Sequence, residues 1–389
     1  MQSLTVVIPC LNEAQTLGKC VEKAKAALQK TGLAYQVLVA DNGSSDGSQS
    51  IAEAAGATVI AVAEKGYGAA LHAGIMAATS QAVLFADADC SYDFAELERF
   101  LPPLEAGAQL VVGNRFTGGI RKGAMPFLHR YLGTPVISFI GRKSFKVTLG
   151  DFNCGMRAIT KLAYEQLNMR SPGMEYASEM IAKAGLLNLR IAEVPVSLHK
   201  DGRNRRPHLR TWQDGWKHLR LILLLSPKWL LLFPALFFLV LGGLLSGLLL
   251  FSYVKVFSLV LDIHTLYYAS VFVILGTQLL QFYVVARLYG SQVGLAAWQP
   301  LSKKMAHWFG FEKGLIVGGS IFCTGLALSF YAVWQWQQAG FGPLDPVAVF
   351  RIIIPAGFCI ALGMQVVVFG FMLYTIQQLG GQHKPLPRA

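Results

Sequence analysis

Several common signatures are missing from this sequence. Its six cysteines, at positions 10, 20, 90, 154, 323 and 359, include no Cys-x-x-Cys pair. This spacing argues against a disulfide framework and a structural zinc site, and it fits a reducing compartment. No Gly-x-Gly-x-x-Gly motif follows the first apolar segment, and the chain has no P-loop lysine motif. Dinucleotide-dependent redox enzymes and P-loop nucleotide hydrolases are therefore disfavoured.

Charge is scarce in the second half of the chain. After Lys228 charged side chains almost disappear, and apolar segments of membrane-spanning length follow. The net charge is nevertheless +12, and much of the excess lies between Arg115 and Lys228. This basic region suits a phosphate-rich partner or a lipid headgroup surface. The positive-inside bias of any membrane protein is the alternative explanation.

We expect four membrane-spanning helices, at about Trp229–Val254, Thr265–Ala286, Gly314–Gln337 and Ile352–Gln378. Basic residues gather in the connection between the second and third spans and in the C-terminal tail: Arg287, Lys303, Lys304, Lys313, Lys384 and Arg388. This bias predicts an integral protein of the inner or plasma membrane with both termini in the cytoplasm, although Lys255 and Arg351 lie on the other side. No basic region precedes the first apolar segment, so we expect no signal peptide.

A different pattern marks residues 208–226. Apolar side chains recur there at helical spacing, at Leu209, Trp212, Trp216, Leu219 and Leu223. The basic residues Arg210, Lys217 and Arg220 lie mostly off that stripe. A basic amphipathic helix with tryptophans suits the membrane interface. Packing against the soluble domain is the alternative.

The first 200 residues alternate β-rich and helical patterns, which predicts an α/β domain with an open, mostly parallel, Rossmann-like sheet. The expected strands are Leu4–Ile8, Tyr35–Ala40, Thr58–Val62, Ala82–Ala86 and Gln109–Gly113. The expected helices are Glu13–Lys30, Asp46–Ala55, Tyr67–Ala78 and Phe94–Glu105. Ligands of such sheets bind at the carboxyl ends of the strands.

Two carboxylates follow one of these strands, in Asp87-Ala88-Asp89. On an extended chain, side chains two residues apart share a face, so both can serve one hard cation. That cation would neutralise a diphosphate and improve it as a leaving group. Asp-x-Asp is common in loops, but its place at a strand end favours a functional role.

Polar motifs follow other strand ends as well. Ile8-Pro9-Cys10-Leu11-Asn12-Glu13 ends the first strand, and the next ends in Asp41-Asn42-Gly43. Asp41 could accept hydrogen bonds from a nucleobase. Lys65-Gly66-Tyr67-Gly68 opens a helix, where backbone amides attract phosphate.

The order and spacing of these motifs over residues 4–206 resemble glycosyltransferase family 2, with its GT-A fold. The resemblance implies a Mg²⁺ or Mn²⁺ cofactor held by Asp87 and Asp89, with Ser91 where some relatives present a glutamine to the metal. It also implies a nucleotide-sugar site formed by Pro9, Asn12, Glu13, Asp41, Lys65, Gly66, Asp87, Ala88 and Glu179. Asn42 departs from the family pattern, which often has a second aspartate there.

Downstream motifs resemble the polyprenyl-phosphate branch of this family, which includes the dolichyl-phosphate mannose and glucose synthases. They are Gly113-Asn114-Arg115-Phe116, His129-Arg130 and Asp151-x-x-Cys154-Gly155-Met156-Arg157. The resemblance implies that Arg115, Arg130, Arg203 and Arg205 hold the acceptor phosphate. It also places Asp151 near the reaction centre and Glu179 at the sugar. The catalytic residues would be Asp89, Asp151, Arg115 and Arg130.

The sequence thus predicts a membrane-anchored enzyme with a cytosolic domain (1–206), a juxtamembrane helix (207–228), a four-helix membrane domain (229–378) and a cytosolic tail (379–389). We expect metal-dependent, inverting transfer of a hexose from UDP-glucose or GDP-mannose to a polyprenyl phosphate. The expected partners are the nucleotide sugar, the lipid acceptor and the membrane, with no nucleic acid, and a homo-oligomer is left open. A processive polysaccharide synthase is one alternative, but its Gln-x-x-Arg-Trp motif is absent. A non-catalytic scaffold or lipid-flipping helper is another.

Overall fold

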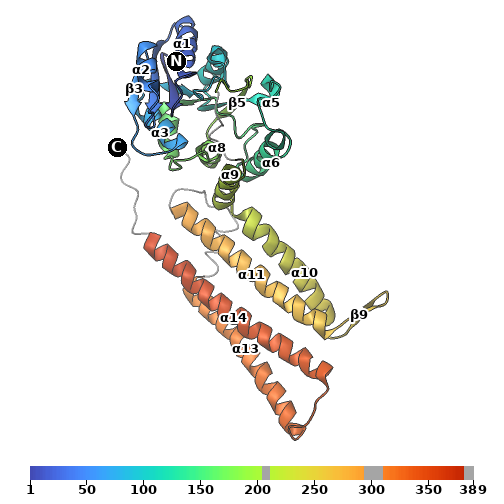
Figure 1. Cartoon of the computed structure of the whole chain (residues 1–389). Helices are drawn as coiled ribbons and strands as arrows, with labels where there is room; N and C mark the ends of the chain where they lie inside the picture. The colour runs from blue at the N-terminus through green and yellow to red at the C-terminus, as the bar shows by residue number, and fades with distance from the viewer. Residues whose placement is uncertain (204–210, 293–309, 381–389) are drawn as a thin grey trace. The chain divides into compact units, whose positions relative to one another are not determined.

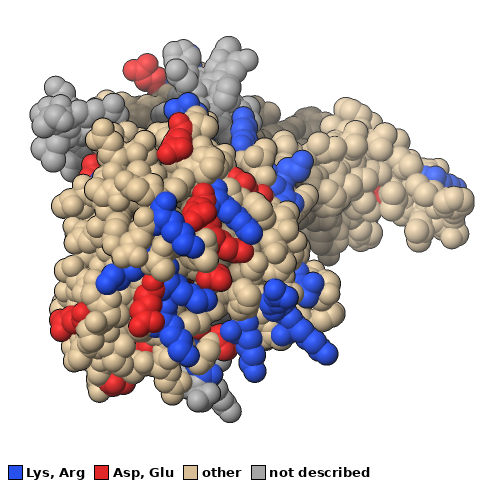
Figure 2. Space-filling view, turned by 90° about the horizontal axis from the view of Figure 1, so that it is seen from above, with Lys and Arg blue, Asp and Glu red and all other residues tan. Residues whose placement is uncertain are grey.

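The computed structural model describes residues 1–203, 211–292 and 310–380 of the chain (Figure 1). It divides into two compact units, Met1–Ser226 and Pro227–Ala389. Lys, Arg, Asp and Glu side chains are interspersed over the face of the first unit that Figure 2 shows. That mixture of charges is typical of a water-exposed surface.

The first unit is built on a seven-stranded sheet in the order β3-β2-β1-β4-β6-β5-β7. The strands are β1 (Ser3–Cys10), β2 (Ala34–Asp41), β3 (Thr58–Ala61), β4 (Ala82–Phe85), β5 (Leu110–Asn114), β6 (Arg157–Thr160) and β7 (Ile191–Pro195). β6 is antiparallel to both of its neighbours, whereas the other pairings are parallel. The predicted α/β domain with a mostly parallel sheet is therefore confirmed. β6 and β7 were not among the predicted strands.

Helices cover the sheet and connect its strands. They are α1 (Leu17–Lys30), α2 (Ser48–Ala54), α3 (Tyr67–Ala77), the 3-10 helix η1 (Phe94–Phe100), α4 (Leu101–Glu105), α5 (Arg115–Gly118), the π-helical turn η2 (His129–Gly133), α6 (Thr134–Phe145), α7 (Lys161–Leu167), α8 (Tyr176–Leu186) and α9 (Thr211–Leu225). α1 packs against α2 and η1, while α3 packs against α8. β1 is buried from Leu4 to Cys10, as expected for a central strand covered on both faces.

The reversed direction of β6 determines which chain segments meet at the site. The carboxyl ends of β1, β2, β4, β5 and β7 lie at one edge of the sheet. Because β6 is antiparallel, its first residue, Arg157, lies at that same edge, in register with Phe85 and Val112. The segments that follow the parallel strands and the segment that precedes β6 therefore converge there.

Helix α9 lies in the first unit, where it packs against α6 and α8. Its buried side chains are His218, Ile222 and Leu225, and His218 Nδ1 is hydrogen-bonded to the Ser178 hydroxyl at 2.8 Å. Trp216 is 60% exposed on another face of the same helix. The amphipathic segment thus packs on the soluble unit through one face and keeps a tryptophan outside it.

The second unit consists of apolar helices and a short hairpin. They are the π-helical turn η3 (Lys228–Leu232), α10 (Phe233–Leu249), β8 (Val254–Val256), β9 (Leu259–Leu261), α11 (Ile263–Gln292), α13 (Phe311–Gln338) and α14 (Pro346–Gly380). Among the residues that the structure describes, four segments are long and apolar enough to cross a membrane: Lys228–Leu249, Ile263–Ser291, Phe311–Gln338 and Pro346–Gln378. The four predicted spans are thus present among the described residues. The last three are longer than predicted, whereas the first ends at Leu249, and Val254, its predicted end, lies in β8.

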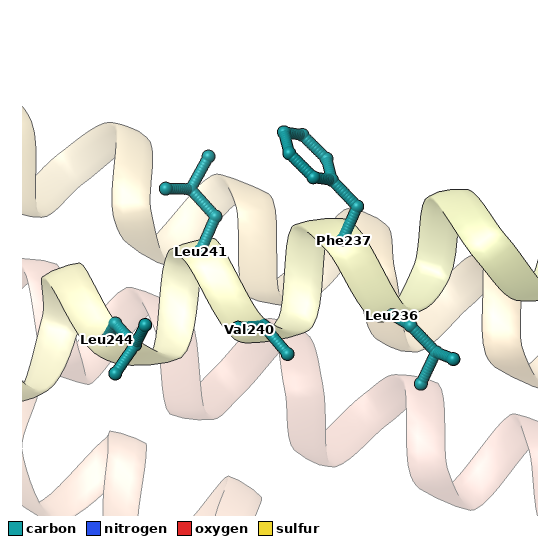
Figure 3. A pocket seen from close by; sticks show the side chains of 5 residues that line it. All are labelled: Leu236, Phe237, Val240, Leu241 and Leu244. Carbon is teal, nitrogen blue, oxygen red and sulfur yellow. The ribbon is translucent and has the colours of Figure 1, made fainter.

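Most residues of these helices are not fully buried within the unit. Between 11% and 28% of the apolar window of each helix is buried inside the unit. On α10, five hydrocarbon side chains line a shallow surface depression (Figure 3): Leu236, Phe237, Val240, Leu241 and Leu244. A surface of this kind suits lipid acyl chains, because it offers no polar group that would need water.

Glycines let the helices of this unit approach in two pairs, α10 with α11 and α13 with α14 (Figure 1). A Cβ atom on Gly318 would lie 2.7 Å from the carbonyl oxygen of Gly363. A Cβ on Gly242 would lie equally close, 2.7 Å, to the carbonyl oxygen of Ala269. Gly319, by contrast, has open space around it. Gly318 and Gly242 therefore serve packing within the bundle.

Arg351 and Asp262 form an ion pair in the second unit. Arg351 also donates to the carbonyl oxygens of Leu249 and Leu250 at the end of α10. Its positive charge is thus neutralised by one carboxylate and by the negative end of a helix dipole. This pairing explains how Arg351 can lie in a connection that the charge bias predicts to be poor in basic residues.

Candidate active site

The acidic pair lies directly after β4, at the carboxyl edge of the sheet. The Tyr67 hydroxyl donates to Asp87 Oδ1 at 2.9 Å, and the Ser91 amide donates to Asp89 Oδ1 at 2.9 Å. Burial and the nearby charge of Asp89 raise the pKa of Asp87 to about 6. Two crowded carboxylates are a donor set that suits a hard divalent cation, because its charge relieves their repulsion.

A divalent cation held by Asp87 and Asp89 would need further ligands to complete its coordination shell. Within residues 1–203, 211–292 and 310–380, no three His, Cys, Asp or Glu side chains converge as a metal site. Diphosphate oxygens and water would therefore complete the shell, as is usual for Mg²⁺ bound to a nucleotide. Ser91, the predicted third ligand, is buried and uses its backbone amide to hold Asp89.

A turn from another part of the chain confines Asp87. The amide of Gly155 donates to the Tyr92 hydroxyl at 2.8 Å, and a Cβ on Gly155 would lie 2.8 Å from Asp87 Oδ2. Arg157 is almost fully buried and donates to the carbonyl oxygens of Phe152, Cys154 and Ala177. Arg157 thus ties this turn and the start of α8 to the sheet beside the acidic pair.

Arg203, which was predicted to hold the acceptor phosphate, contacts carboxylates instead. Its Nη2 lies 2.7 Å from Glu13 Oε1 and 3.3 Å from Asp89 Oδ2. Burial alone would lower the pKa of Arg203, but Asp89 and Glu13 raise it above its ordinary value. Arg205 lies outside the described residues. The structure therefore brings together three residues that were predicted for different parts of the site: Glu13 for the nucleotide, Asp89 for the metal and Arg203 for the acceptor phosphate.

The loops after β1 and β2 are joined by hydrogen bonds. The Asn12 amide donates to Ser44 Oγ at 2.8 Å, and Asn12 Oδ1 accepts from the Ser45 amide at 2.8 Å. The Glu13 amide donates to Ser48 Oγ at 2.8 Å. Asn12 adopts a left-handed backbone with φ 58°, which asparagine tolerates better than most residues. Two predicted nucleotide-site segments thus form one structural element.

Asp41 is buried in that element and caps its own turn. It accepts hydrogen bonds from the amides of Gly43 and Ser44 and from Gln49 Nε2. Burial raises the pKa of Asp41, but the hydrogen bonds from Ser44, Gln49 and Gly43 outweigh that effect and hold it below its ordinary value. The carboxylate is therefore ionised and already engaged by several donors.

The hydrogen bonds of Asn42 account for an asparagine at a position where the family pattern often has a second aspartate. Its amide nitrogen donates to the carbonyl oxygens of Val62 and Glu64, and its Oδ1 accepts from the Gly66 amide at 2.7 Å. An aspartate could not donate to either carbonyl. The backbone oxygen of Asn42 also accepts from Lys65 Nζ at 2.6 Å. Asn42 thereby fixes the chain that leads into α3.

The start of α3 is packed rather than open. The Ala69 amide donates to the Pro172 carbonyl at 3.1 Å, and a Cβ on Gly66 would lie 2.1 Å from that same oxygen. Glu179, predicted to face the sugar, accepts from the amides of Arg170 and Ser171 and pairs with Lys183 at 2.6 Å. Gly66 and Glu179 thus shape the 170–175 loop that lies against α3.

Arg115 and Asp151 form a buried, bidentate ion pair. Arg115 Nε donates to Asp151 Oδ2 at 2.6 Å, and Nη2 donates to Oδ1 at 2.8 Å. Burial opposes the charge on Arg115, but Tyr92 and Asp151 hold its pKa well above the ordinary value. Its Nη1 has no hydrogen-bond partner in the described part of the chain. One edge of the guanidinium thus remains for an anionic ligand.

Arg130 lies on η2, in a segment with exposed apolar side chains. Its guanidinium carbon is 5.5 Å from the ring centroid of Tyr131. Large apolar side chains on this segment point to solvent: Phe127, Leu128, Tyr131, Leu132, Val136 and Phe139. Burial and the positive charge of Arg115 lower the pKa of the neighbouring His129. Arg130 thus lies in an exposed apolar segment, and the preceding residue, His129, is close enough to Arg115 to be affected by its charge.

Three contacting residues were absent from the predicted site: Tyr67, Tyr92 and Arg157. Tyr67 was noted as part of a glycine-rich helix start, and Arg157 closes a motif that carried the family resemblance. Their contacts to Asp87, Gly155 and the 152–154 turn depend on tertiary structure. No local spacing signals such contacts.

Comparison with known proteins decides the family. Residues 5–167 match the glycosyl transferase family 2 domain, and residues 284–377 match the glycosyltransferase family 2 C-terminal transmembrane region. The chain is 33% identical over 375 residues to the low-salt glycan biosynthesis hexosyltransferase Agl6 of Haloferax volcanii, covering 96% of this chain and 89% of that protein. The chain belongs to glycosyltransferase family 2. The resemblance seen in the sequence, the GT-A fold and the membrane region are all confirmed.

Other similar proteins carry more specific names. A dolichyl-phosphate hexose transferase of Haloferax volcanii is 29% identical over 195 residues, which is 50% of this chain and 81% of that protein. An undecaprenyl-phosphate 4-deoxy-4-formamido-L-arabinose transferase of Klebsiella pneumoniae is 28% identical over 165 residues, 41% of this chain and 49% of that protein. The crystal structure of glucosyl-3-phosphoglycerate synthase of Mycobacterium tuberculosis with Mn²⁺ and UDP-glucose is more distant. It has a TM-score of 0.48 and 22% identity, and the match covers 57% of this chain and 79% of that one.

Proposed function

We propose that this glycosyltransferase moves a hexose from a nucleotide sugar to the phosphate of a polyprenyl phosphate, with Mg²⁺ or Mn²⁺ as cofactor. The observation that carries the proposal is the arrangement of opposite charges at one sheet edge. Asp87 and Asp89 follow β4, while Arg115, held by Asp151, follows β5. Such a site can bind two phosphate-bearing substrates, one through a cation and one through a guanidinium.

Three further features support the lipid acceptor. Relatives named for dolichyl phosphate and undecaprenyl phosphate share the family domain. In the described part of the chain, four helices are long and apolar enough to cross a membrane. The segment around Arg130 exposes Phe127, Tyr131 and Leu132, side chains that suit contact with hydrocarbon. A phosphate on a long apolar chain matches this combination of arginine and exposed aromatic groups.

The donor side of the reaction would use the acidic pair. A divalent cation held by Asp87 and Asp89 would offset the charge of the diphosphate and improve it as a leaving group. The joined loops that carry Asn12, Glu13 and Asp41 would hold the nucleoside, and Tyr67 would keep Asp87 oriented. UDP-glucose and GDP-mannose are the donors that we propose to test.

The acceptor side would use arginine. The planar fork of Arg115 is fixed by Asp151 and presents its remaining edge to a phosphate oxygen. The second pKa of a phosphate monoester is about 6, so at neutral pH its oxygen can act as a nucleophile and needs no general base to remove a proton. Its oxygen forms a bond to the anomeric carbon as the bond to the diphosphate breaks, and the electron pair leaves with the nucleoside diphosphate. In-line displacement inverts the anomeric centre and gives a β-linked product.

We further propose that residues 1–206 form the catalytic domain on the cytoplasmic side of the membrane and that both termini lie there. The basic residues Arg287, Lys303, Lys304 and Lys313 between the second and third spans support this orientation. The pairing of Arg351 with Asp262 removes the main contrary charge. Because the proposed acceptor stays in the bilayer, the membrane helices would keep the catalytic domain close to it.

The test uses full-length protein in lipid nanodiscs with Mn²⁺, a short polyprenyl phosphate and either UDP-glucose or GDP-mannose. We expect release of nucleoside diphosphate from one donor and formation of a glycosylated lipid phosphate, both detected by mass spectrometry. Asp89→Asn should lower the rate by about 100-fold, because one cation ligand loses its charge. The free polyprenol is the matched acceptor control and should not react. Equal transfer to the alcohol would contradict the phosphate acceptor.

A further inference from the structure

Two cysteine sulfurs are in contact beneath the acidic pair. Cys20 Sγ on α1 lies 3.5 Å from Cys90 Sγ, and 70 residues separate the two along the chain. Cys90 immediately follows Asp89. A disulfide bond is about 2.0 Å long, so the sulfurs need to approach by about 1.5 Å to bond.

The two thiols have different surroundings. Cys20 is 1% exposed and its thiol donates to the carbonyl oxygen of Ala88 at 3.4 Å. Cys90 is partly exposed, and its thiol donates to the carbonyl oxygen of Thr16 at 3.7 Å. The Cys90 sulfur is therefore accessible to a dissolved oxidant, whereas the Cys20 sulfur is buried next to it. This is the usual arrangement of a reactive and a resolving cysteine.

The backbone of Cys90 adopts a left-handed conformation with φ 63°, which residues with a Cβ atom rarely adopt. This conformation turns the chain between Asp89 and Ser91 and directs the Cys90 side chain to α1. Cys10, the buried last residue of β1, contacts Ser44 rather than a second cysteine. The contact between Cys20 and Cys90 is thus a feature of the acidic turn itself.

We propose that Cys20 and Cys90 form a redox-sensitive pair that closes to a disulfide under peroxide and weakens cation binding at the acidic turn. Cys90 attacks hydrogen peroxide, which breaks the O–O bond, forms a sulfenic acid and releases water. The Cys20 sulfur then attacks the sulfenic sulfur and releases a second water. Two thiols and one peroxide thereby give one disulfide and two waters, and a dithiol reductant reverses the change.

The effect on the acidic turn follows from geometry, and this part rests on the proposed function. Closing the disulfide pulls Cys90 toward α1 and removes the thiol proton that Cys20 donates to Ala88. Both shifts act on the three-residue turn that carries Asp87 and Asp89. Displacing cation ligands in this way should weaken divalent-cation binding by about tenfold.

The first test maps the disulfide. Full-length protein is treated with hydrogen peroxide, its free thiols are blocked, and it is digested with trypsin without reduction. Cys10, Cys20 and Cys90 fall in separate tryptic peptides, residues 1–19, 20–23 and 66–99. We expect the 20–23 peptide linked to the 66–99 peptide, and release of both by dithiothreitol. If Cys20 and Cys90 are each recovered blocked or singly oxidised, the proposal fails, whatever the enzyme does.

The second test measures Mn²⁺ binding by electron paramagnetic resonance, before and after oxidation. We expect the dissociation constant to rise about tenfold in the wild type and to stay constant in Cys20→Ser, where the hydroxyl can still donate to Ala88. Cys323→Ser, at an exposed position on α13, is the matched control and should respond as the wild type does. A linked peptide with unchanged Mn²⁺ affinity would overturn the proposed switch. Absence of Mn²⁺ binding in the reduced protein would instead contradict the proposed function and leave the disulfide result standing.

Discussion

Arg203 lies 3.3 Å from Asp89, so a protein cation contacts a carboxylate that is proposed to hold a metal cation. Glu13 contacts the same guanidinium at 2.7 Å. The two positive charges compete for one side chain, and metal binding at Asp89 therefore favours release of Arg203. Arg203 is also the residue that the family resemblance assigns to the acceptor phosphate. Donor and cation binding would in this way free an arginine for the second substrate.

We predict that Arg203→Ala binds Mn²⁺ about tenfold more tightly than the wild type when no nucleotide is present, because a competing charge is removed. Transfer to the lipid phosphate should fall in the same variant. Titration of Mn²⁺ by electron paramagnetic resonance gives the affinity, and the nanodisc assay gives the rate. Arg121→Ala, at an exposed position, is the control. Equal or weaker Mn²⁺ binding by Arg203→Ala would contradict the competition.

Variants of the buried ion pair between Arg115 and Asp151 should affect the stability of the protein and its transfer activity differently. Asp151→Ala leaves a buried guanidinium unpaired and should destabilise the protein by about 3–5 kcal/mol. The double variant Arg115→Met, Asp151→Leu removes both charges and should recover much of that loss, yet it should remain inactive. Thermal unfolding in detergent and the transfer assay measure the two effects. Transfer activity in the double variant would show that Arg115 does not bind the acceptor.

Asp41 should make the stability of the first unit depend on pH. Its pKa is lower in the folded protein than in the unfolded chain, so its contribution is present above about pH 4 and is lost as the pH falls through the folded pKa. Asp41→Asn should therefore cost about 2 kcal/mol at pH 7 and much less at pH 3. Unfolding curves at both values test this difference. Glu105→Gln, at an exposed position on α4, should show no comparable trend.

Adjacent glycines on α13 provide a matched pair of substitutions. Gly318→Leu places side-chain atoms where the Gly363 carbonyl now lies, 2.7 Å from an added Cβ, whereas Gly319→Leu points into open space. We predict that the first change destabilises the helix pair by about 1–3 kcal/mol and that the second changes little. Thermal stability in one detergent compares them directly. Equal effects of the two changes would show that packing of α13 on α14 does not depend on Gly318.

The sequence predicted five of the seven strands of the sheet but not their order. Strands β1 to β5 follow apolar runs that are bounded by turn residues, and these were found within about two residues. β6 has four residues and passes straight into α7, so no pattern separates it from the helix. Its antiparallel direction is set by neighbours far away in the chain. Three membrane helices are longer than predicted, because residues outside the apolar run can continue the same backbone hydrogen bonding. The first helix ends at Leu249, before its predicted end at Val254, because the chain there enters the β8–β9 hairpin.

The residues of the candidate site were easier to identify than their partners. Strand-end position and family resemblance pointed to Asp87, Asp89, Arg115 and Asp151 without specifying that the last two pair. The contact of Arg203 with Glu13 spans 190 residues, and no periodicity describes such a distance. Short-range reasoning also did not predict that Glu179 accepts backbone amides and pairs with Lys183. Those uses depend on how the 170–175 loop folds.

The reversal of β6 has a consequence for how enzymes of this design can diversify. The chain leaves the sheet after β5 at Asn114 and re-enters at Arg157, and both points lie at one edge. Everything between them is an insertion whose two ends are fixed side by side. Such an insertion can lengthen, shorten or exchange its surface without shifting the register of any strand. The segment that carries Arg115, Arg130 and Asp151, which we propose to bind the acceptor, can therefore change while the segments that follow β1, β2 and β4 stay the same.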